Sequence, residues 1–238
     1  MNKKRREALQ KFCASLQLEM DDIELLNVAL THTSYAYEAK VKPRPEYNQR
    51  LEFLGDSVLS LVVSTYIYDK YTTKDEGYLS KLRAFLVCEG TLAYLATGAK
   101  LGDYLLLGKG ELNLNGEHNP SILADAFEAV IGAYYLSAGL VKVEKFLYDV
   151  MLKNIDELAK DGLELDYKTR LQEKVQKQGV AEIGYEELSA QGPAHAKVFT
   201  MRVLINGKEF GTGSGHSKKE AEQQAAKVTL ATINKKDS

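Results

Sequence analysis

Apolar residues recur at helical spacing over the first two thirds of the chain. From Asn48 to Tyr71, leucine, valine and isoleucine return every three or four positions, which predicts a long helix that is buried on most sides. The same spacing, with starts at Asp22 and Pro120, predicts further helices over residues 2–16, 22–31, 75–87, 89–96, 120–136 and 140–159. The pattern therefore predicts an all-helical N-terminal domain.

Two stretches interrupt the helical pattern of this domain. Residues 35–47 contain Pro43 and Pro45 among Lys40, Lys42 and Arg44, so they cannot be helical throughout and are expected to form a basic loop. Residues 102–119 are rich in glycine and asparagine, which predicts an irregular segment.

The period of the pattern changes after Asp166. A helix over 167–177 is followed by three predicted strands over 185–190, 197–205 and 208–213, and Asn206-Gly207 is typical of a hairpin turn. Ser217 is then expected to cap a closing helix. The predicted second domain is a small α+β unit with the order α-β-β-β-α. The predicted boundaries are 1–159 for the first domain, 160–165 for a short linker and 166–238 for the second domain.

The composition of the chain restricts the class of protein and the compartment in which we expect it. The chain has 238 residues, of which 45% are hydrophobic and 27% charged, and its two cysteines are far apart, which favours neither a zinc site nor a disulfide framework. The apolar run Val58 to Val63 is too short to span a bilayer, and no signal-peptide core follows the N-terminus. We expect a cytoplasmic protein with no membrane partner.

The net charge of −2 hides an asymmetry between the two domains. Residues 1–165 carry 19 Lys and Arg against 24 Asp and Glu, a balance of −5, whereas residues 166–238 carry 12 against 9, a balance of +3. The basic part is compatible with a polyanionic partner and the acidic part with bound cations.

Two pairs of carboxylates lie on otherwise apolar helices. Glu52 and Asp56 are four residues apart on the long helix, and Asp125 and Glu128 are three apart on the helix that begins at Pro120. Such spacings put each pair on one helix face about 5–6 Å apart. A divalent cation would offset the repulsion within a pair, and a solvated acidic stripe explains the first pair equally well.

Four segments resemble the ribonuclease III endonucleases in the order of that family. R-L-E-F-L-G-D-S-V-L at 50–59 is similar to the family signature, and S-I-L-A-D-A-F-E-A at 121–129 to its second acidic motif. A-L-T-H-T-S at 29–34 and D-E-G-Y-L-S-K-L-R-A at 75–84 are also similar to family segments. The resemblance implies that the two acidic helices face each other and that Mg²⁺, or Mn²⁺ in its place, is held by Glu52, Asp56, Asp125 and Glu128. By the same resemblance, Asp56 and Glu128 are the catalytic residues. His32, at the end of the predicted helix 22–31, is interpreted as structural from its position alone.

Three further residues acquire expected roles from the resemblance. Gln49 stands where many family members have Glu, so a supporting amide replaces a supporting charge. Glu76 corresponds to another acidic family position, although helix capping or a local salt bridge is the alternative. Phe53 resembles the aromatic residue that inserts into the partner of a homodimer, and the alternative is a core residue.

The C-terminal part resembles a double-stranded-RNA-binding domain. Y-K-T-R-L-Q-E at 167–173, G-P-A-H at 192–195 and S-K-K-E-A-E-Q-Q-A-A at 217–226 carry this resemblance. It implies contacts of Gln172, Glu173 and His195 with 2′-hydroxyl groups, and of Lys218 and Lys219 with phosphates. The alternatives are a turn residue for His195 and a solvated basic helix start for the two lysines.

Together the two resemblances imply a Mg²⁺-dependent endoribonuclease that hydrolyses double-stranded RNA. Its products would carry 5′-phosphate and 3′-hydroxyl ends with two-nucleotide 3′ overhangs, and its role would be ribosomal and messenger RNA processing. A non-catalytic RNA-binding relative is the rival hypothesis, but a scaffold has no need of four carboxylates in two apolar helices, where unpaired charge is costly. A cation-buffering helical protein would leave the C-terminal domain unexplained.

Overall fold

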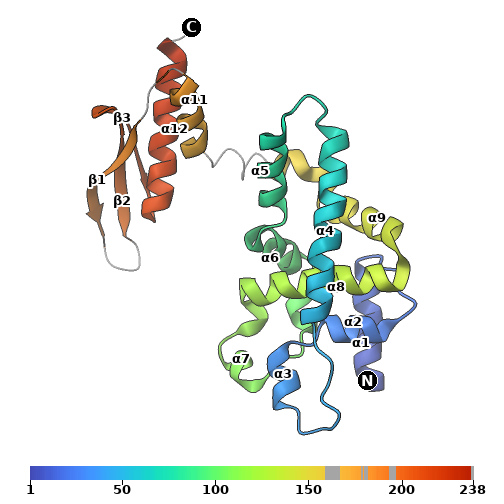
Figure 1. Ribbon diagram of the computed structural model, residues 1–238. Helices are drawn as coiled ribbons and strands as arrows, with labels where there is room; N and C mark the ends of the chain where they lie inside the picture. Colours follow the sequence, from blue (N-terminus) through green and yellow to red (C-terminus); the bar gives the residue numbers. More distant parts are fainter. Residues whose placement is uncertain (159–166, 178, 180–181, 193–196, 237–238) are drawn as a thin grey trace. The chain divides into compact units, whose positions relative to one another are not determined.

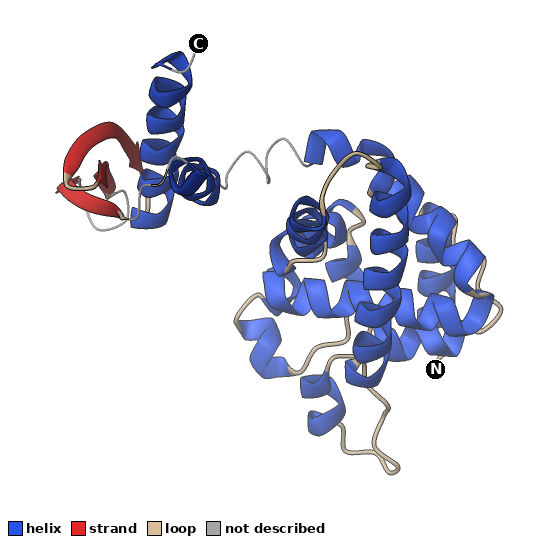
Figure 2. Cartoon of the chain, turned by 45° about the horizontal axis from the view of Figure 1, so that its top comes forward, coloured by secondary structure: helices blue, strands red, loops and turns tan. Residues whose placement is uncertain are grey.

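The computed structural model describes residues 1–158, 167–177, 179, 182–192 and 197–236 (Figure 1). The chain forms two compact units, Met1–Ala159 and Lys160–Ser238, which are described separately. The predicted linker 160–165 lies outside the described residues, so its boundaries stay a prediction. Figure 2 shows helices throughout the first unit and the strands in the second.

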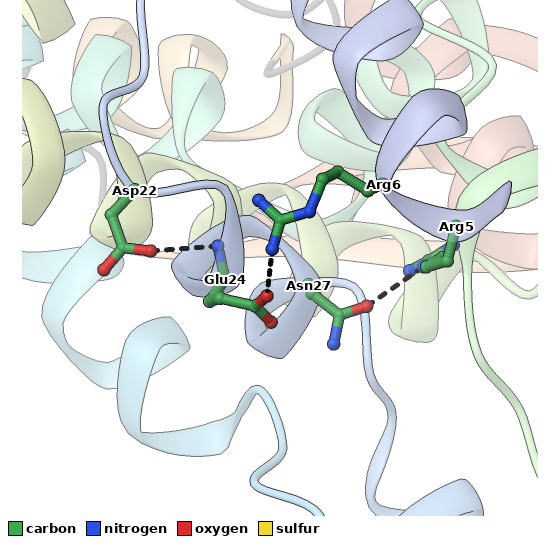
Figure 3. Close-up of polar contacts among 5 residues, drawn as sticks. All are labelled: Arg5, Arg6, Asp22, Glu24 and Asn27. Atoms are coloured by element: carbon green, nitrogen blue, oxygen red, sulfur yellow. Dashed lines mark hydrogen bonds and ion pairs between the residues drawn. The ribbon is translucent and has the colours of Figure 1, made fainter. Parts of the chain in front are cut away.

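The first unit begins with helices that are capped by the residues the sequence offers. Asn2 and Asp22 accept hydrogen bonds from the backbone N–H groups of Arg5 and Glu24, which satisfies donors that a helix start leaves unpaired. Figure 3 shows the Asp22 cap together with the Arg6–Glu24 ion pair and the Arg5–Asn27 hydrogen bond that fasten the first helix to the second. The helices of this half are α1 (Lys3–Ser15), α2 (Ile23–Ala29), α3 (Thr33–Glu38), α4 (Gln49–Lys70), α5 (Glu76–Leu86) and α6 (Glu89–Gly98).

The structure corrects three details of the expected helical unit. The expected basic loop is shorter, because residues 35–38 belong to α3 and the prolines at 43 and 45 restrict only their immediate neighbours. The expected irregular segment 102–119 contains short helices, which are η1 (Leu101–Tyr104), α7 (Lys109–Asn113) and η2 (Gly116–His118). The expected helix 140–159 is broken at Met151, which leaves the helical conformation and is fully buried, so that α9 (Leu140–Val150) is followed by η3 (Leu152–Asn154).

Helices α4 and α8 (Pro120–Ala138) cross at the centre of the helical unit with their backbones in contact. A side chain on Gly55 would overlap the carbonyl oxygen of Glu128, and one on Gly132 would overlap that of Leu51. Two glycines therefore permit this close crossing.

By length and composition alone, α4 could cross a bilayer, which the sequence argument from the short run Val58 to Val63 did not anticipate. Seven of its residues are buried within this unit, and packing against α8 accounts for its apolar character.

The second unit has the predicted order. An antiparallel sheet, β1-β2-β3, is formed by β1 (Ile183–Gln191), β2 (Val198–Ile205) and β3 (Lys208–Gly215), and it packs with α11 (Tyr167–Lys177) and α12 (Lys218–Lys236). Its core includes Leu171, Val203 and Ala225 from three of these elements. Asn206 and Gly207 both have positive φ, as a type I′ hairpin turn requires. Ser217 accepts a hydrogen bond from the N–H of Glu220 and caps α12, which confirms the predicted start.

Candidate functional site

The crossing of α4 and α8 brings the two acidic pairs together. Gly55 lies between Glu52 and Asp56, and its closest neighbour across the interface is the backbone of Glu128. Asp125 is one turn earlier on α8. The close crossing therefore gathers carboxylates whose residues are more than sixty positions apart in the chain.

The electrostatics of the four acids show that they interact. Burial and the negative charges of the other three acids together raise the pKa of Glu128 to about 7, and burial is the largest cause. Burial also raises the pKa of Glu52, with Asp125 and Asp56 contributing in the same direction. Each of these shifts means that the cluster resists carrying its full negative charge in the absence of a cation.

The pKa of Asp125 is raised by burial and by Glu89, while the nearby His32 opposes the rise. His32 also caps α3, where its ring accepts a hydrogen bond from the N–H of Ser34, so its structural interpretation is confirmed. The sequence did not indicate its proximity to Asp125, because the two residues are brought close only by the tertiary fold.

No basic side chain in the described part of the chain forms an ion pair with any of the four acids; the ion pairs found there join other residues. Nor do the described residues include a group of three or more His, Cys, Asp or Glu side chains placed tightly enough to hold an ion directly. The donor set nevertheless fits Mg²⁺, because carboxylates are the hard ligands it prefers and it retains several water ligands. The cluster is thus suited to a partly hydrated divalent cation.

The two expected supporting residues lie in different places. Gln49 is exposed at the first residue of α4, one turn before Glu52. Glu76 begins α5, at the far end of α4, where Tyr78 packs against Tyr71. Glu76 accepts a hydrogen bond from the Ser80 hydroxyl at 2.6 Å, and Asp75 rather than Glu76 caps the helix. Within one chain Glu76 does not join the four acids, and its supporting role stays a prediction.

Phe53 is 78% exposed, so the alternative of a core residue is wrong. Leu61 and Tyr68 on the same helix are also exposed, by 54% and 71%. Their spacing of eight and seven residues places the three side chains along one side of α4. An apolar strip therefore faces outward from the helix that carries Glu52 and Asp56.

The expected RNA-contacting residues of the second unit are at its surface where they are described. Gln172 and Glu173 are exposed on α11, and Gln172 lines a cleft of about 250 Å³ with Lys168 and Tyr185. Lys218 and Lys219 begin α12, and the Lys218 ammonium lies 2.8 Å from Glu187 on β1. His195 lies outside the described residues.

Each of the two units is similar to a known protein family. A family model described as ribonuclease-III-like matches residues 22–155, and one described as a double-stranded RNA binding motif matches residues 167–233. The chain is 46% identical over 230 residues to Ribonuclease 3 of Bacillus cereus (strain G9842), covering 97% of this chain and 93% of that protein. Ribonuclease 3 of Bacillus anthracis (strain A0248) is 47% identical over the same coverage.

Among solved structures, two of the nuclease domain of ribonuclease III from Campylobacter jejuni are similar to the helical unit. One is 44% identical with a TM-score of 0.55, and it covers 60% of this chain and 94% of its own. That structure is described as showing flexibility in the region involved in dimer formation. The other is 41% identical with a TM-score of 0.54, covering 64% and 94%.

Proposed function

Since this chain belongs to the ribonuclease III family of double-stranded-RNA-specific endoribonucleases, we propose that it hydrolyses RNA duplexes with Mg²⁺, for which Mn²⁺ can substitute. Water adds to the phosphorus, the bond to the 3′ oxygen breaks, and the proton lost by the water is balanced by protonation of that oxygen. The products carry 5′-phosphate and 3′-hydroxyl ends. We propose ribosomal and messenger RNA precursors in the cytoplasm as the substrates.

The observation that carries this proposal is the cluster of Glu52, Asp56, Asp125 and Glu128 at the crossing of α4 and α8. These four side chains would hold the metal, with Asp56 and Glu128 as the catalytic pair. When bound, Mg²⁺ supplies positive charge that stabilises the phosphate oxygens as they gain charge. The elevated pKa of Glu128 supports this assignment, because a bound cation would remove the repulsion that contributes to it.

Two other residues would support the cluster without holding the metal themselves. Gln49 would donate or accept hydrogen bonds near Glu52, since its amide has both capacities but no charge. Glu76 would have to act elsewhere along the duplex or through a second subunit. It lies at the start of α5, beside the end of α4 that is remote from Glu52.

The apolar strip on α4 supports a homodimer. Phe53, Leu61 and Tyr68 are large side chains that are all exposed along one side of α4, and a second copy of the strip would bury them. Pairing would place two clusters across one duplex, so that each strand is cut once and the ends overhang by two nucleotides.

The C-terminal unit binds double-stranded RNA, and we assign the contacts residue by residue. Gln172, Glu173 and His195 would contact 2′-hydroxyl groups across the minor groove, and Lys218 and Lys219 would contact phosphates. The Lys218–Glu187 pair does not oppose this role, because the lysine is exposed, water and salt screen such a pair, and a phosphate can compete for the ammonium.

One assay separates the proposal from a non-catalytic RNA-binding relative. A long, perfectly paired RNA is incubated with the protein in Mg²⁺, in EDTA and in Ca²⁺, and the ends of the products are mapped. We expect cleavage in Mg²⁺ alone, with 5′-phosphates and two-nucleotide 3′ overhangs. Binding of the duplex without cleavage in Mg²⁺ would instead favour the non-catalytic relative.

A further inference from the structure

A basic loop connects α3 to α4 and is not used by the site described above. It comprises residues 39–47, and Figure 1 shows it extending from the end of the helical unit where α4 begins. Lys40, Lys42 and Arg44 are all exposed there, and the loop's one acidic residue, Glu46, leaves it with a balance of +2. The helical unit as a whole is acidic, with 18 Lys and Arg against 22 Asp and Glu in residues 1–159, a balance of −4. The loop is therefore a positively charged segment in a negatively charged unit.

Arg44 is held in place by an aromatic ring. Its guanidinium carbon lies 4.0 Å from the centroid of the Tyr37 ring, and the Tyr47 ring lies 6.1 Å from that of Tyr37. A guanidinium that stacks on an aromatic face keeps its N–H groups at the rim, where they match the oxygens of a phosphate. The stack therefore orders the side chain and leaves its donors available.

Three other arginines of the chain are held by polar partners. Arg6 is paired with Glu24 and Arg5 donates to Asn27, as Figure 3 shows, and Arg202 is paired with Glu186 and Glu209. In the described part of the chain, none of the three cations of the basic loop forms an ion pair. The adjacent acid, Glu38, is engaged instead by the backbone N–H groups of Lys109 and Gly110. The loop cations are thus available to an external anion.

The loop is tied to the end of α4 that carries the acidic cluster. The N–H of Asn48 donates to the carbonyl of Thr31 at 3.0 Å, and the N–H of Glu52 donates to the carbonyl of Asn48 at 2.9 Å. Four extended residues from Arg44 to Asn48 span at most about 14 Å, and one helical turn to Glu52 adds about 6 Å. Arg44 and Glu52 are therefore at most about 20 Å apart along the chain.

A duplex whose scissile phosphate lies at the acidic cluster extends far beyond this distance. Double-stranded DNA carries about one negative charge per 1.7 Å of helix axis, and an RNA duplex is a comparable polyanion. On the order of ten charges therefore fall within about 20 Å of the cut. Because the unit itself is acidic, a local group of cations beside the cluster would oppose the repulsion that the duplex meets there.

We propose that the basic loop binds the phosphate backbone of the duplex beside the cleavage site, through Lys40, Lys42 and the stacked Arg44. This inference rests on the proposed function, since it assumes a duplex at the acidic cluster. It assigns RNA contacts to the nuclease unit in addition to those of the C-terminal unit. A loop that is merely solvated, or that contacts an acidic protein, would leave duplex binding unchanged when its charges are removed.

The first test is the salt dependence of duplex binding by the full chain in EDTA, where no cleavage competes. A variant with Lys40→Gln, Lys42→Gln and Arg44→Gln is compared with a control carrying Lys3→Gln, Lys4→Gln and Lys11→Gln on α1. Both variants lose three charges from the same unit. We expect the slope of log Kd against log salt to flatten by roughly two units in the loop variant, since each lost contact removes about 0.7–0.9, and by less than about half a unit in the control. Equal slopes in the two variants would overturn the proposal.

The second test uses the wild-type chain, so it does not depend on folding of the loop variant. Lysines are acetylated with an amine-reactive reagent with and without duplex, and each site is quantified by mass spectrometry. Protection of Lys40 and Lys42, with Lys3, Lys4 and Lys11 unchanged, is the expected result. Unchanged reactivity of Lys40 and Lys42 while the duplex is bound would overturn the proposal.

The stack itself gives a finer test in the same binding assay. Arg44→Lys keeps the charge but loses the planar fork, and Tyr37→Leu removes the ring beneath it, so both should weaken duplex binding, whereas Tyr37→Phe should not. Wild-type binding by Arg44→Lys and by Tyr37→Leu would show that the stack does not contribute to duplex binding. Failure of these tests is distinguishable from failure of the proposed function, because they measure binding in EDTA and the proposed function is measured by cleavage in Mg²⁺.

Discussion

Replacing Gly55 with alanine tests whether the close crossing of α4 and α8 builds the site. In an isolated helix, Gly→Ala stabilises by about 1 kcal/mol. Here the new Cβ would overlap the Glu128 carbonyl oxygen and lie 2.6 Å from its carbonyl carbon and 3.0 Å from the Gly132 nitrogen. Ordinary van der Waals contact begins at 3.4 Å, and the carbonyl oxygen is the closest atom, so the helices must separate by roughly 1–2 Å.

This separation should affect both stability and activity. Overpacking of this kind costs about 1–3 kcal/mol, which should more than offset the gain in helix propensity, so the free energy of unfolding should fall. Glu52 and Asp56 would also move away from Asp125 and Glu128, and a misplacement of about 1 Å can cost on the order of 100-fold in rate. We therefore expect Gly55→Ala to lose activity by a larger factor than its modest loss of stability would suggest.

Urea unfolding and single-turnover cleavage of a defined duplex in saturating Mg²⁺ measure these two effects. Gly90→Ala in α6 is the matched control, because a Cβ there has no neighbour within 4 Å. The control should be as stable as the wild type or more so, and fully active. If Gly55→Ala behaved like Gly90→Ala in both assays, the close crossing of α4 and α8 would not be what positions the acids.

The remaining predictions concern individual side chains. Metal-free wild-type protein should lose stability as the pH rises from about 5 to 8, because the folded state holds a proton on Glu128 up to a pKa of about 7. Allowing for solvent screening, the free energy of unfolding should fall by about 1 kcal/mol over this range. Urea unfolding in EDTA should show no such fall for Glu128→Gln. Gln49→Ala should lower the cleavage rate and raise the Mg²⁺ requirement about 10- to 100-fold, whereas Glu52→Ala should remove activity; equal loss in both would contradict the supporting role. Lys218→Ala with Lys219→Ala should flatten the salt dependence of duplex binding by up to about two units, and an unchanged slope would exclude phosphate contacts. Light scattering should give the mass of a dimer at micromolar concentration, and Phe53→Ala should shift it toward the monomer.

Much of the fold could be predicted because its signals are local. The caps at Asp22 and Ser217, the proline at 120 and the Asn206-Gly207 turn act within a few residues, and the structure confirms each of them. The acidic pairs were visible for the same reason, since each lies within one helical turn. Helix α3 was missed because the prolines at 43 and 45 dominated the interpretation of residues before them.

The tertiary features could not be predicted from local patterns. Gly55 and Gly132 are glycines inside apolar helices, a signal that indicates close packing but does not identify the partner. The proximity of His32 to Asp125 and the Tyr37–Arg44 stack depend on segments that meet only after folding. Apolar spacing alone would also assign Phe53 to the core, although its side chain is exposed.

We propose one divalent-metal site for RNA hydrolysis, formed by the four carboxylates together. Its most direct test is the single-turnover rate of duplex cleavage, titrated with Mg²⁺, for Glu52→Gln, Asp56→Asn, Asp125→Asn and Glu128→Gln, with duplex binding measured in parallel. We predict that all four variants bind the duplex within a few-fold of the wild type, and that each loses nearly all cleavage or needs far more Mg²⁺. A variant that cleaves at the wild-type rate with the wild-type Mg²⁺ requirement would contradict the claim that the four acids form one site.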